Sequence, residues 1–237
     1  MKFDDFLVNE TYNSLLIENI RVRKDTLMRI LPSKKTASFN QEQAANYIKA
    51  SAFAYSIARD NKLMNRLNIP DNFVIMVNKI LLYGSPEPLS YRRHNVIVTG
   101  SPLIPPPVEY VYKWMKIWRR FAYLYHTQME PMEFVAKQHI LFESIHPFED
   151  GNGRTGRIIN NFFLLSLGHQ PVILKGDYHS KKEYYKALEC AQEGLTELTD
   201  ESPDTEKVLK VMKIMKSQKM ERLMQNNMED VDDWFFA

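Results

Sequence analysis

The chain has 237 residues, of which 44% are apolar and 25% charged, a balance typical of one large globular domain or a domain with an appendage. Its 31 Lys and Arg residues nearly equal its 29 Asp and Glu residues, so the net charge gives no electrostatic reason to bind nucleic acid. No apolar run approaches the ~18–20 residues of a membrane span, and the acidic start at residues 1–5 is unlike a signal peptide. The single cysteine, Cys190, cannot form an internal disulfide, which fits a reducing cytoplasmic setting. From these observations together, we expect a cytoplasmic protein with no membrane span and no nucleic-acid partner.

Apolar residues recur with helical spacing through most of the first part of the chain. One or two amphipathic helices are predicted over residues 4–30, and Pro32 is expected to end this stretch. Residues 32–38 are polar and indicate a linker. Helices are predicted next at about 40–60 and 71–83, before a break rich in glycine and proline.

Residues 91–104 differ from the helical sequence around them. The β-branched run Val96-Ile97-Val98, followed by turn-forming residues, predicts a small β-hairpin. Three prolines at 105–107 then favour an extended connection. The predicted fold class is therefore all-α with one small β-hairpin.

Helices are predicted again at about 108–128 and 131–145. A short loop then leads into an almost wholly apolar helix, which we expect to be the buried central helix and to end at a Gly168 cap. Helical segments at 181–193 and 204–225 complete the chain. The last of these carries regularly spaced lysines, which indicate either a surface that binds membranes or acidic partners, or a packed helix with a solvated lysine face.

Residues 146–157 read His-Pro-Phe-Glu-Asp-Gly-Asn-Gly-Arg-Thr-Gly-Arg, and they concentrate groups that carry chemistry. The run Gly151, Asn152 and Gly153, at a junction of loop and helix, can turn successive backbone N–H groups toward one point and so form an anion-binding nest. Arg154 and Arg157 are three residues apart, so we expect both on one helix face near this nest. Two arginines and a nest suit a polyphosphate.

Three further residues complete this prediction. Asp150 lies just before the nest, where a carboxylate can hold Mg²⁺ against phosphate oxygens. His146, at the start of the loop, can accept a proton at neutral pH. His139 fits no common zinc spacing with His146 and is expected to pack or hydrogen-bond inside its own helix.

The stretch 146–157 resembles the signature of the Fic family, His-x-Phe-x-(Asp/Glu)-Gly-Asn-Gly-Arg-x-x-Arg, and matches every defined position. Residues 91–98 with the prolines behind them look like the flap of this family, and residues 184–188 look like the helix that closes its nucleotide pocket. The resemblance covers roughly residues 40–200. Fic proteins are mostly α-helical with a β-hairpin flap, and most transfer AMP from ATP to a hydroxyl of a protein target.

The resemblance implies a role for each matched position. His146 would deprotonate the target hydroxyl, which would attack the α-phosphate, and Asp150 would hold Mg²⁺. The nucleotide would be bound by Gly151, Asn152, Gly153, Arg154, Arg157, Tyr184 and Tyr185, with Arg154 at the β-phosphate and Arg157 at the γ-phosphate. The flap residues Asn95, Val96, Ile97 and Val98 would pair with an extended segment of the target.

Many Fic proteins also carry an inhibitory helix with the pattern (Ser/Thr)-x-x-x-Glu-(Gly/Asn), which residues 14–19 match fully. Ser14 and Glu18 would lie on one helix face, and Glu18 would pair with Arg157 and occupy the γ-phosphate position. Two other stretches, starting at Ser56 and Ser217, match only in part. The alternative is an ordinary amphipathic helix with a surface glutamate.

We therefore predict an AMP transferase inhibited by its own N-terminal helix, with ATP and Mg²⁺ as ligands. Three alternatives remain open at this stage: removal of AMP from a modified protein with the help of Glu18, a nucleotide-binding module without turnover, and a different nucleotide donor. The expected domains are an inhibitory helical region at 1–31, a catalytic core at 32–203 and a basic helix with an acidic and aromatic tail at 204–237. The tail at 229–237 either docks on a second subunit, forming a homodimer, or is mobile.

Overall fold

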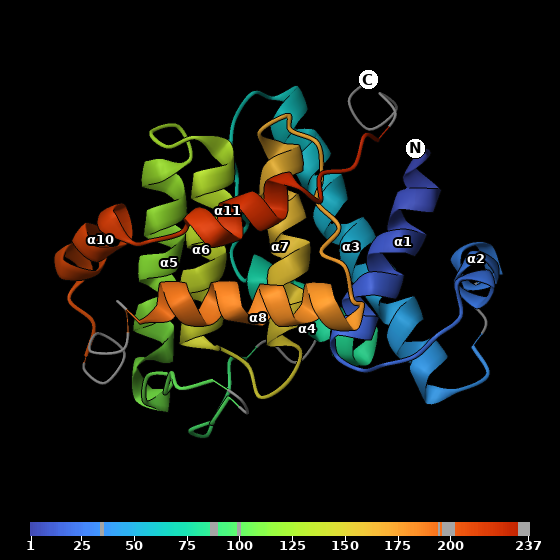
Figure 1. The fold of residues 1–237 in the computed structure, drawn as a ribbon, viewed down its shortest axis with the longest axis horizontal. Helices are drawn as coiled ribbons and strands as arrows, with labels where there is room; N and C mark the ends of the chain where they lie inside the picture. Colours follow the sequence, from blue (N-terminus) through green and yellow to red (C-terminus); the bar gives the residue numbers. More distant parts are fainter. Residues whose placement is uncertain (34–35, 86–89, 99–100, 194, 196–201, 232–237) are drawn as a thin grey trace.

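The computed structural model describes residues 1–33, 36–85, 90–98, 101–193, 195 and 202–231 (Figure 1). Regular structure in these residues is helical, and the single β-bridge among them joins Val172 and Met228. The helices are α1 (Phe3–Ile17), α2 (Lys24–Ser33), α3 (Phe39–Leu63), α4 (Phe73–Tyr83), η1 (Val108–Tyr110, a 3₁₀ turn), α5 (Val111–Tyr125), α6 (Pro131–Ile145), α7 (Asn152–Ser166), α8 (Tyr178–Gln192), α10 (Thr205–Ile214) and α11 (Gln218–Gln225). The prediction of an all-α fold is confirmed.

Helix α7 is the centre of the fold (Figure 1). Every residue of it except Gly153 is buried, and it packs between α3 and α6. It ends as predicted at Gly168, which has φ 78°, and the His169 amide donates to the Leu164 carbonyl at 2.8 Å. The N-terminus of this buried helix is therefore held in a fixed position, which suits a functional site.

Helix α1 packs against α2, α3 and α7, so the N-terminal region lies directly on the central bundle (Figure 1). The amino group of Met1 donates to the Asp230 carbonyl at 2.7 Å, which brings the start of the chain next to residues near its end. Helix α2 ends at Ser33, one residue beyond Pro32. Pro32 thus lies in the last turn of the helix, where it interrupts little further helical structure.

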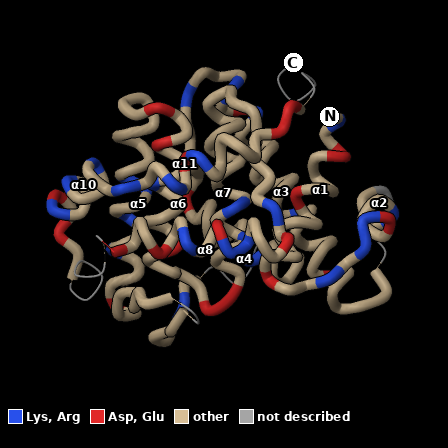
Figure 2. Tube along the Cα trace, viewed as in Figure 1, with Lys and Arg blue, Asp and Glu red and all other residues tan. Residues whose placement is uncertain are grey.

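The helix predicted at 204–225 is two helices, and the prediction of one continuous helix is wrong. Met215 has an extended backbone, with φ −56° and ψ 137°. The break lets α10 pack on α5 while α11 packs on α6 and α8. Lysines of α10 are exposed while Val208, Leu209 and Met212 are buried, and Figure 2 shows basic positions interspersed with acidic ones along the chain.

The predicted β-hairpin at 91–104 is not formed by the described residues of this segment, which are extended without strand pairing. Side chains of this segment instead bond to backbone groups of the segment and of the residues that follow it. The Arg92 guanidinium donates to the carbonyls of His94 and Pro106, and the Asn95 side chain accepts from the Val108 amide at 2.8 Å. Among the described helices, none is both long and apolar enough to cross a membrane.

Candidate active site

The loop at 146–151 joins α6 to α7 and has left-handed backbone at both ends. Gly151 has φ 77°, which glycine adopts at no steric cost, whereas His146 has φ 49°, a conformation that a residue with a side chain adopts only where its surroundings impose it. Asn152 closes the loop, because its side chain accepts from the Phe148 amide at 2.9 Å and donates to the Phe148 carbonyl at 2.8 Å. Phe148 itself is buried.

The His146 imidazole is half-buried at the start of this loop. Its Nδ1 lies 3.3 Å from the Glu143 carbonyl, and because a carbonyl only accepts, Nδ1 carries the proton and Nε2 is the basic nitrogen. Burial, helped by the nearby charge of Arg92, lowers the pKa of His146 to about 4. The imidazole is therefore neutral at neutral pH and ready to accept a proton.

Asp150 and Arg154 pair across the first turn of α7. Arg154 Nη2 lies 3.1 and 3.2 Å from the two carboxylate oxygens of Asp150, and its Nη1 donates to the Gln43 side chain at 3.1 Å. The Asp150 side chain is 70% exposed, and it also accepts from the Gly151 amide at 2.6 Å. This carboxylate is thus oriented by the protein and open to solvent. No cluster of three or more His, Cys, Asp or Glu side chains suited to a metal occurs among the described residues.

Arg157 lies on the same helix but reaches a different partner, the C-terminal end of α1. Its Nε donates to Ser14 Oγ at 2.8 Å and its Nη2 to Glu18 Oε1 at 2.7 Å. The arginine is buried. Burial opposes its charge, but the Glu18 carboxylate and the nearby Tyr184 and Tyr47 together outweigh that effect, so the pKa of Arg157 lies above its ordinary value. The two arginines do not converge on one point, because each has its own acidic partner.

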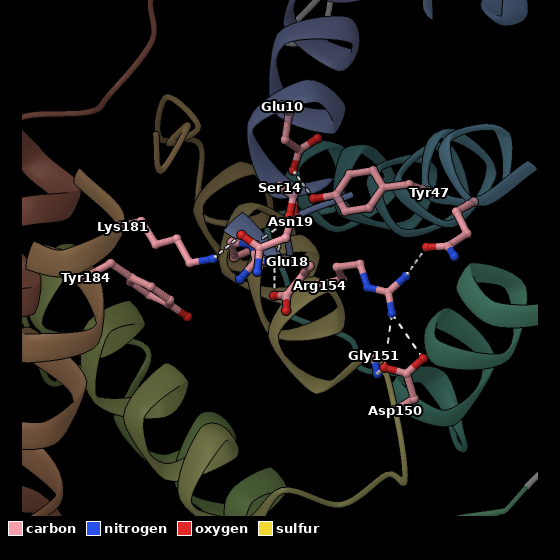
Figure 3. A network of polar contacts seen from close by, with 12 residues as sticks. Glu10, Ser14, Glu18, Asn19, Tyr47, Asp150, Gly151, Arg154, Lys181 and Tyr184 are labelled. Carbon is pink, nitrogen blue, oxygen red and sulfur yellow. Dashed lines mark hydrogen bonds and ion pairs between the residues drawn. The ribbon is translucent and has the colours of Figure 1, made fainter. Parts of the chain in front are cut away.

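The end of α1 explains how Glu18 reaches Arg157. Helix α1 ends at Ile17, and Asn19 has φ 61°, a left-handed conformation that asparagine tolerates. The Lys181 ammonium holds this turn by donating to the Asn19 side chain at 3.0 Å (Figure 3). A Cβ at Gly153 would lie 2.7 Å from Glu18 Oε1, so only glycine leaves room for the carboxylate at the start of α7.

A cavity of about 520 Å³ opens between the junction of α6 and α7, helix α8 and segment 91–104. Its volume lies within the range of ~300–1,000 Å³ typical of small-molecule sites. The predicted site residues that line it are His146, Gly153, Arg157, Tyr184, Tyr185, Glu18, Ile97 and Val98. The structure thus brings together residues from four separate parts of the chain around one cavity.

The two tyrosines of α8 differ in their surroundings. Tyr184 is buried, with its hydroxyl 2.9 Å from His139 Nε2 and its ring 6.0 Å from the Arg157 guanidinium, so His139 is hydrogen-bonded in the interior as expected, although to another helix. Tyr185 is 44% exposed. Because both rings line the cavity, α8 forms one of its walls.

Segment 91–104 is tied at its base to the loop at 146–151. Arg92 Nε donates to the His146 carbonyl at 3.0 Å, and the Arg92 amide donates to the Pro147 carbonyl at 2.9 Å. Beyond this anchor the chain is open to solvent, and Ile97 is 88% exposed. The segment therefore presents an extended edge beside the cavity, with Val96 and Val98 on either side of Ile97.

Two buried acids near this site were not singled out from the sequence. Glu143 lies in the last turn of α6, three residues before His146, and both side chains line the same cavity. Glu10 precedes Ser14 by one turn of α1. It accepts from the Asn161 side chain at 2.9 Å and from the Tyr55 hydroxyl, and burial raises its pKa to about 7. A periodicity search for charged residues on the buried faces of α1 and α6 would have found both.

Comparison with known proteins agrees with this geometry. Residues 68–164 match the Fic/DOC family. The chain is 29% identical over 197 residues to a probable protein adenylyltransferase of Aquifex aeolicus, covering 81% of this chain and 58% of that protein. It is 32% identical over 136 residues to protein adenylyltransferase Fic of Drosophila sechellia, covering 56% of this chain and 27% of that protein. The chain thus spans only about three-fifths and one-quarter of the lengths of these relatives.

Solved structures show the same fold. A Fic domain containing signalling protein of Bacteroides thetaiotaomicron superimposes with a TM-score of 0.70 at 20% identity, over 94% of this chain and 86% of that one. Fic-1 of C. elegans gives a TM-score of 0.66 at 22% identity, over 95% of this chain and 63% of that one. The helical fold and the loop at the start of α7 define a Fic domain. The chain thus matches the Fic/DOC family over residues 68–164, about two-fifths of its length, and shares the fold of Fic-domain structures.

Proposed function

We propose that this chain transfers AMP from ATP to a Ser, Thr or Tyr hydroxyl of a protein target and that Glu18 inhibits the transfer. One observation carries the proposal: the neutral His146 imidazole and the cationic Arg157 line one cavity at the N-terminus of α7. The relatives named protein adenylyltransferase support the same reaction.

The chemistry follows from the positions of these groups. His146 Nε2 takes the proton of the target hydroxyl, the oxygen attacks the α-phosphorus, and the bond from that phosphorus to the bridging oxygen breaks, so pyrophosphate leaves. The backbone N–H groups of Asn152 and Gly153 bind the α- and β-phosphates, since the first N–H groups of a helix have no partner within the helix. The Gly151 N–H donates to the Asp150 carboxylate and joins them once that bond is released. Fixed donors at this point stabilise the negative charge that develops in the transition state.

The arginines and α8 hold the rest of the nucleotide. Arg154 contacts the β-phosphate, Arg157 the γ-phosphate once Glu18 has left it, and Tyr184 and Tyr185 close the nucleoside end. The Asp150 carboxylate fits Mg²⁺, because this ion is commonly held by one or two carboxylates together with substrate phosphates, and it would neutralise phosphate charge when bound. Because the Asp150 carboxylate is exposed, the other ligands of the ion can bind from the solvent side.

The inhibitory contact is supported by the pairing of Glu18 with Arg157 at 2.7 Å and by the bond from Arg157 to Ser14. While Glu18 is paired with Arg157, the γ-phosphate of ATP can neither pair with the Arg157 guanidinium nor occupy the position that the Glu18 carboxylate fills. The target is expected to bind along residues 95–98, where the chain is extended beside the cavity and Ile97 is exposed. Backbone pairing there would fix the register of the target segment with little demand on its side chains.

Transfer of label from α-labelled ATP with Mg²⁺ tests the proposal. The wild type should label weakly, Glu18→Gly strongly, and Glu18→Gly combined with His146→Ala not at all. Glu221→Gly is a matched control, because Glu221 has the same spacing from Ser217 as Glu18 from Ser14 yet bonds only to that serine in the described contacts. Equal labelling of wild type and Glu18→Gly would contradict the inhibition. Absence of labelling in every variant would contradict the transfer and favour AMP removal, another donor or a binding module.

A further inference from the structure

A separate cavity, of about 720 Å³, lies between the C-terminal end of α1 and the first part of α8. Lys181 and Tyr185 line both this cavity and the one beside His146, so the two adjoin. The proposed transfer uses only the cavity beside His146. We call the separate cavity the basic groove, and its chemistry indicates a ligand of a different kind.

Positive charge dominates the basic groove. Its cations are Arg21, Lys181, Lys182 and Lys186, and its acids are Asp177 and Glu189. The excess of two positive charges equals the net charge of the whole chain, so it is concentrated here. The Asp177 carboxylate is already used, because it accepts from two backbone amides in the first turn of α8. Arg21, Lys182 and Lys186 form no ion pair with the described residues, so they can bind an acidic ligand.

The groove also presents aromatic surface. The Tyr178 side chain is 84% exposed and Tyr185 is 44% exposed, and the half-buried Leu16 lies between α1 and these rings. The Lys181 ammonium lies 5.8 Å from the centre of the Tyr185 ring. Rings and cations together suit a segment that combines acidic with aromatic side chains, since aromatic rings pack against one another and also bind cations.

The two walls of the groove are tied together. The Gly176 amide donates to the Asn13 side chain at 3.1 Å, and the Lys181 ammonium donates to the Asn19 side chain at 3.0 Å. Because these bonds join α8 and the chain before it to α1, the groove is preformed and little ordering opposes binding. It also borders the turn that carries Glu18.

The chain itself contains a segment of the required chemistry. Residues 232–237 read Asp-Asp-Trp-Phe-Phe-Ala, two acids followed by three aromatic residues. They belong to the tail that the sequence analysis left without a function, and they lie outside the described residues. Their charge and their aromatic character complement those of the groove.

The acids of one copy cannot reach the lysines of its own groove. The Met1 amino group donates to the Asp230 carbonyl at 2.7 Å, so the segment follows from the N-terminal end of α1. The groove lies at the other end of this 15-residue helix, about 22 Å away (Figure 1). Asp233 is two residues beyond Val231 and extends at most ~7 Å from it. Acids that enter the groove therefore come from a second copy.

We propose that residues 232–237 of a second copy bind in the basic groove, with their acids on Lys182 and Lys186 and their aromatic side chains against Tyr178 and Tyr185. In a two-fold dimer each copy gives its segment to the other, so the contact occurs twice. The inference goes beyond the proposed function and does not depend on it.

Sedimentation velocity of the full chain over a range of concentrations tests the inference. The mass of the wild type should rise with concentration from one copy to two. Lys182→Glu combined with Lys186→Glu should weaken association about tenfold or more, because attractive contacts become repulsive. Asp232→Lys combined with Asp233→Lys should weaken it similarly. All four substitutions in one chain restore opposite charges and should recover association, and that recovery also excludes a folding defect.

A matched control separates this contact from a general effect of charge. Lys207→Glu combined with Lys210→Glu makes the same charge change at exposed positions of α10 and should leave association unchanged. A wild type that stays a single copy at every concentration would overturn the inference and assign the groove to an acidic partner of another kind. Association that neither charge reversal weakens, or that the four substitutions together do not restore, would overturn it as well.

Discussion

The Glu18 carboxylate lies 2.7 Å from the Arg157 guanidinium, and it fits there because residue 153 has no side chain. Glycine at position 153 thus permits the close approach of Glu18, at the end of α1, to the first turn of α7. Arg157 also binds Ser14, one turn earlier on α1, so two positions of one helix hold a single buried cation.

Ser14→Ala should weaken the inhibition without abolishing it. The variant loses the hydroxyl that accepts from Arg157 Nε, while the Ser14 carbonyl and Glu18 still bind the guanidinium. We expect self-labelling with α-labelled ATP to rise about fivefold to tenfold, less than in Glu18→Gly. Thr11→Val is the control on the same helix, because the buried Thr11 hydroxyl has no partner among the described residues, and labelling should not change. Equal labelling of both variants would refute the role of Ser14.

The pH dependence of the transfer should reveal the buried state of His146. Proton transfer requires the neutral imidazole, so activity is lost as the pH falls through its pKa, which burial places at about 4. In Glu18→Gly, kcat/KM should therefore be nearly constant from pH 7 down to about pH 5. Removal of Glu18 also removes a charge that raises this pKa, which shifts the loss to still lower pH. A decline with a midpoint near the ordinary value of 6.5 would contradict the geometry of the site.

Much of the fold could be predicted because its signals are local in sequence. The apolar pattern of α7 indicates that this helix is buried, and Gly168 indicates where it ends. The candidate functional groups of the loop and the first turn of α7 lie within twelve consecutive residues, 146–157. The break between α10 and α11 could not be predicted, because it depends on the different helices that each of them packs against.

The sequence predicts less of the site, because several of its contacts join residues that are far apart in the chain. The pairing of Ser14 and Glu18 with Arg157 spans some 140 positions, and only a family pattern connects them in sequence. The hairpin expected at 91–104 depends on strand partners, and the side chains of Arg92 and Asn95 bind the backbone there instead. The buried position of Glu143 depends on the close approach of two helices, which sequence spacing alone does not specify.

Asp150→Asn should raise the Mg²⁺ concentration needed for half-maximal transfer by about tenfold or more, because Asp150 is the carboxylate that would hold the ion in the proposed site. A metal chelator should abolish transfer, and added Mg²⁺ should restore it. Glu149→Gln neutralises the neighbouring exposed carboxylate and should leave the Mg²⁺ requirement unchanged. A similar Mg²⁺ requirement in wild type and Asp150→Asn would exclude Asp150 as the metal ligand.

Arg92→Met should reduce both transfer and stability, since Arg92 connects the flap segment to the loop that carries His146. Its buried guanidinium donates to three carbonyls, those of His146, His94 and Pro106, and methionine keeps the apolar stem but none of these bonds. We expect kcat/KM to fall at least tenfold in the Glu18→Gly background and the free energy of unfolding to fall by about 1–3 kcal/mol.

Arg93→Met is the matched control for this prediction. Arg93 is the adjacent arginine, its side chain is exposed, and only its backbone amide bonds to Glu149, at 3.4 Å. Its replacement should change neither kcat/KM nor thermal stability by a measurable amount. Because both variants remove one positive charge beside the cavity, equal losses in the two would assign the effect to charge, whereas a loss confined to Arg92→Met assigns it to the bonds that position His146.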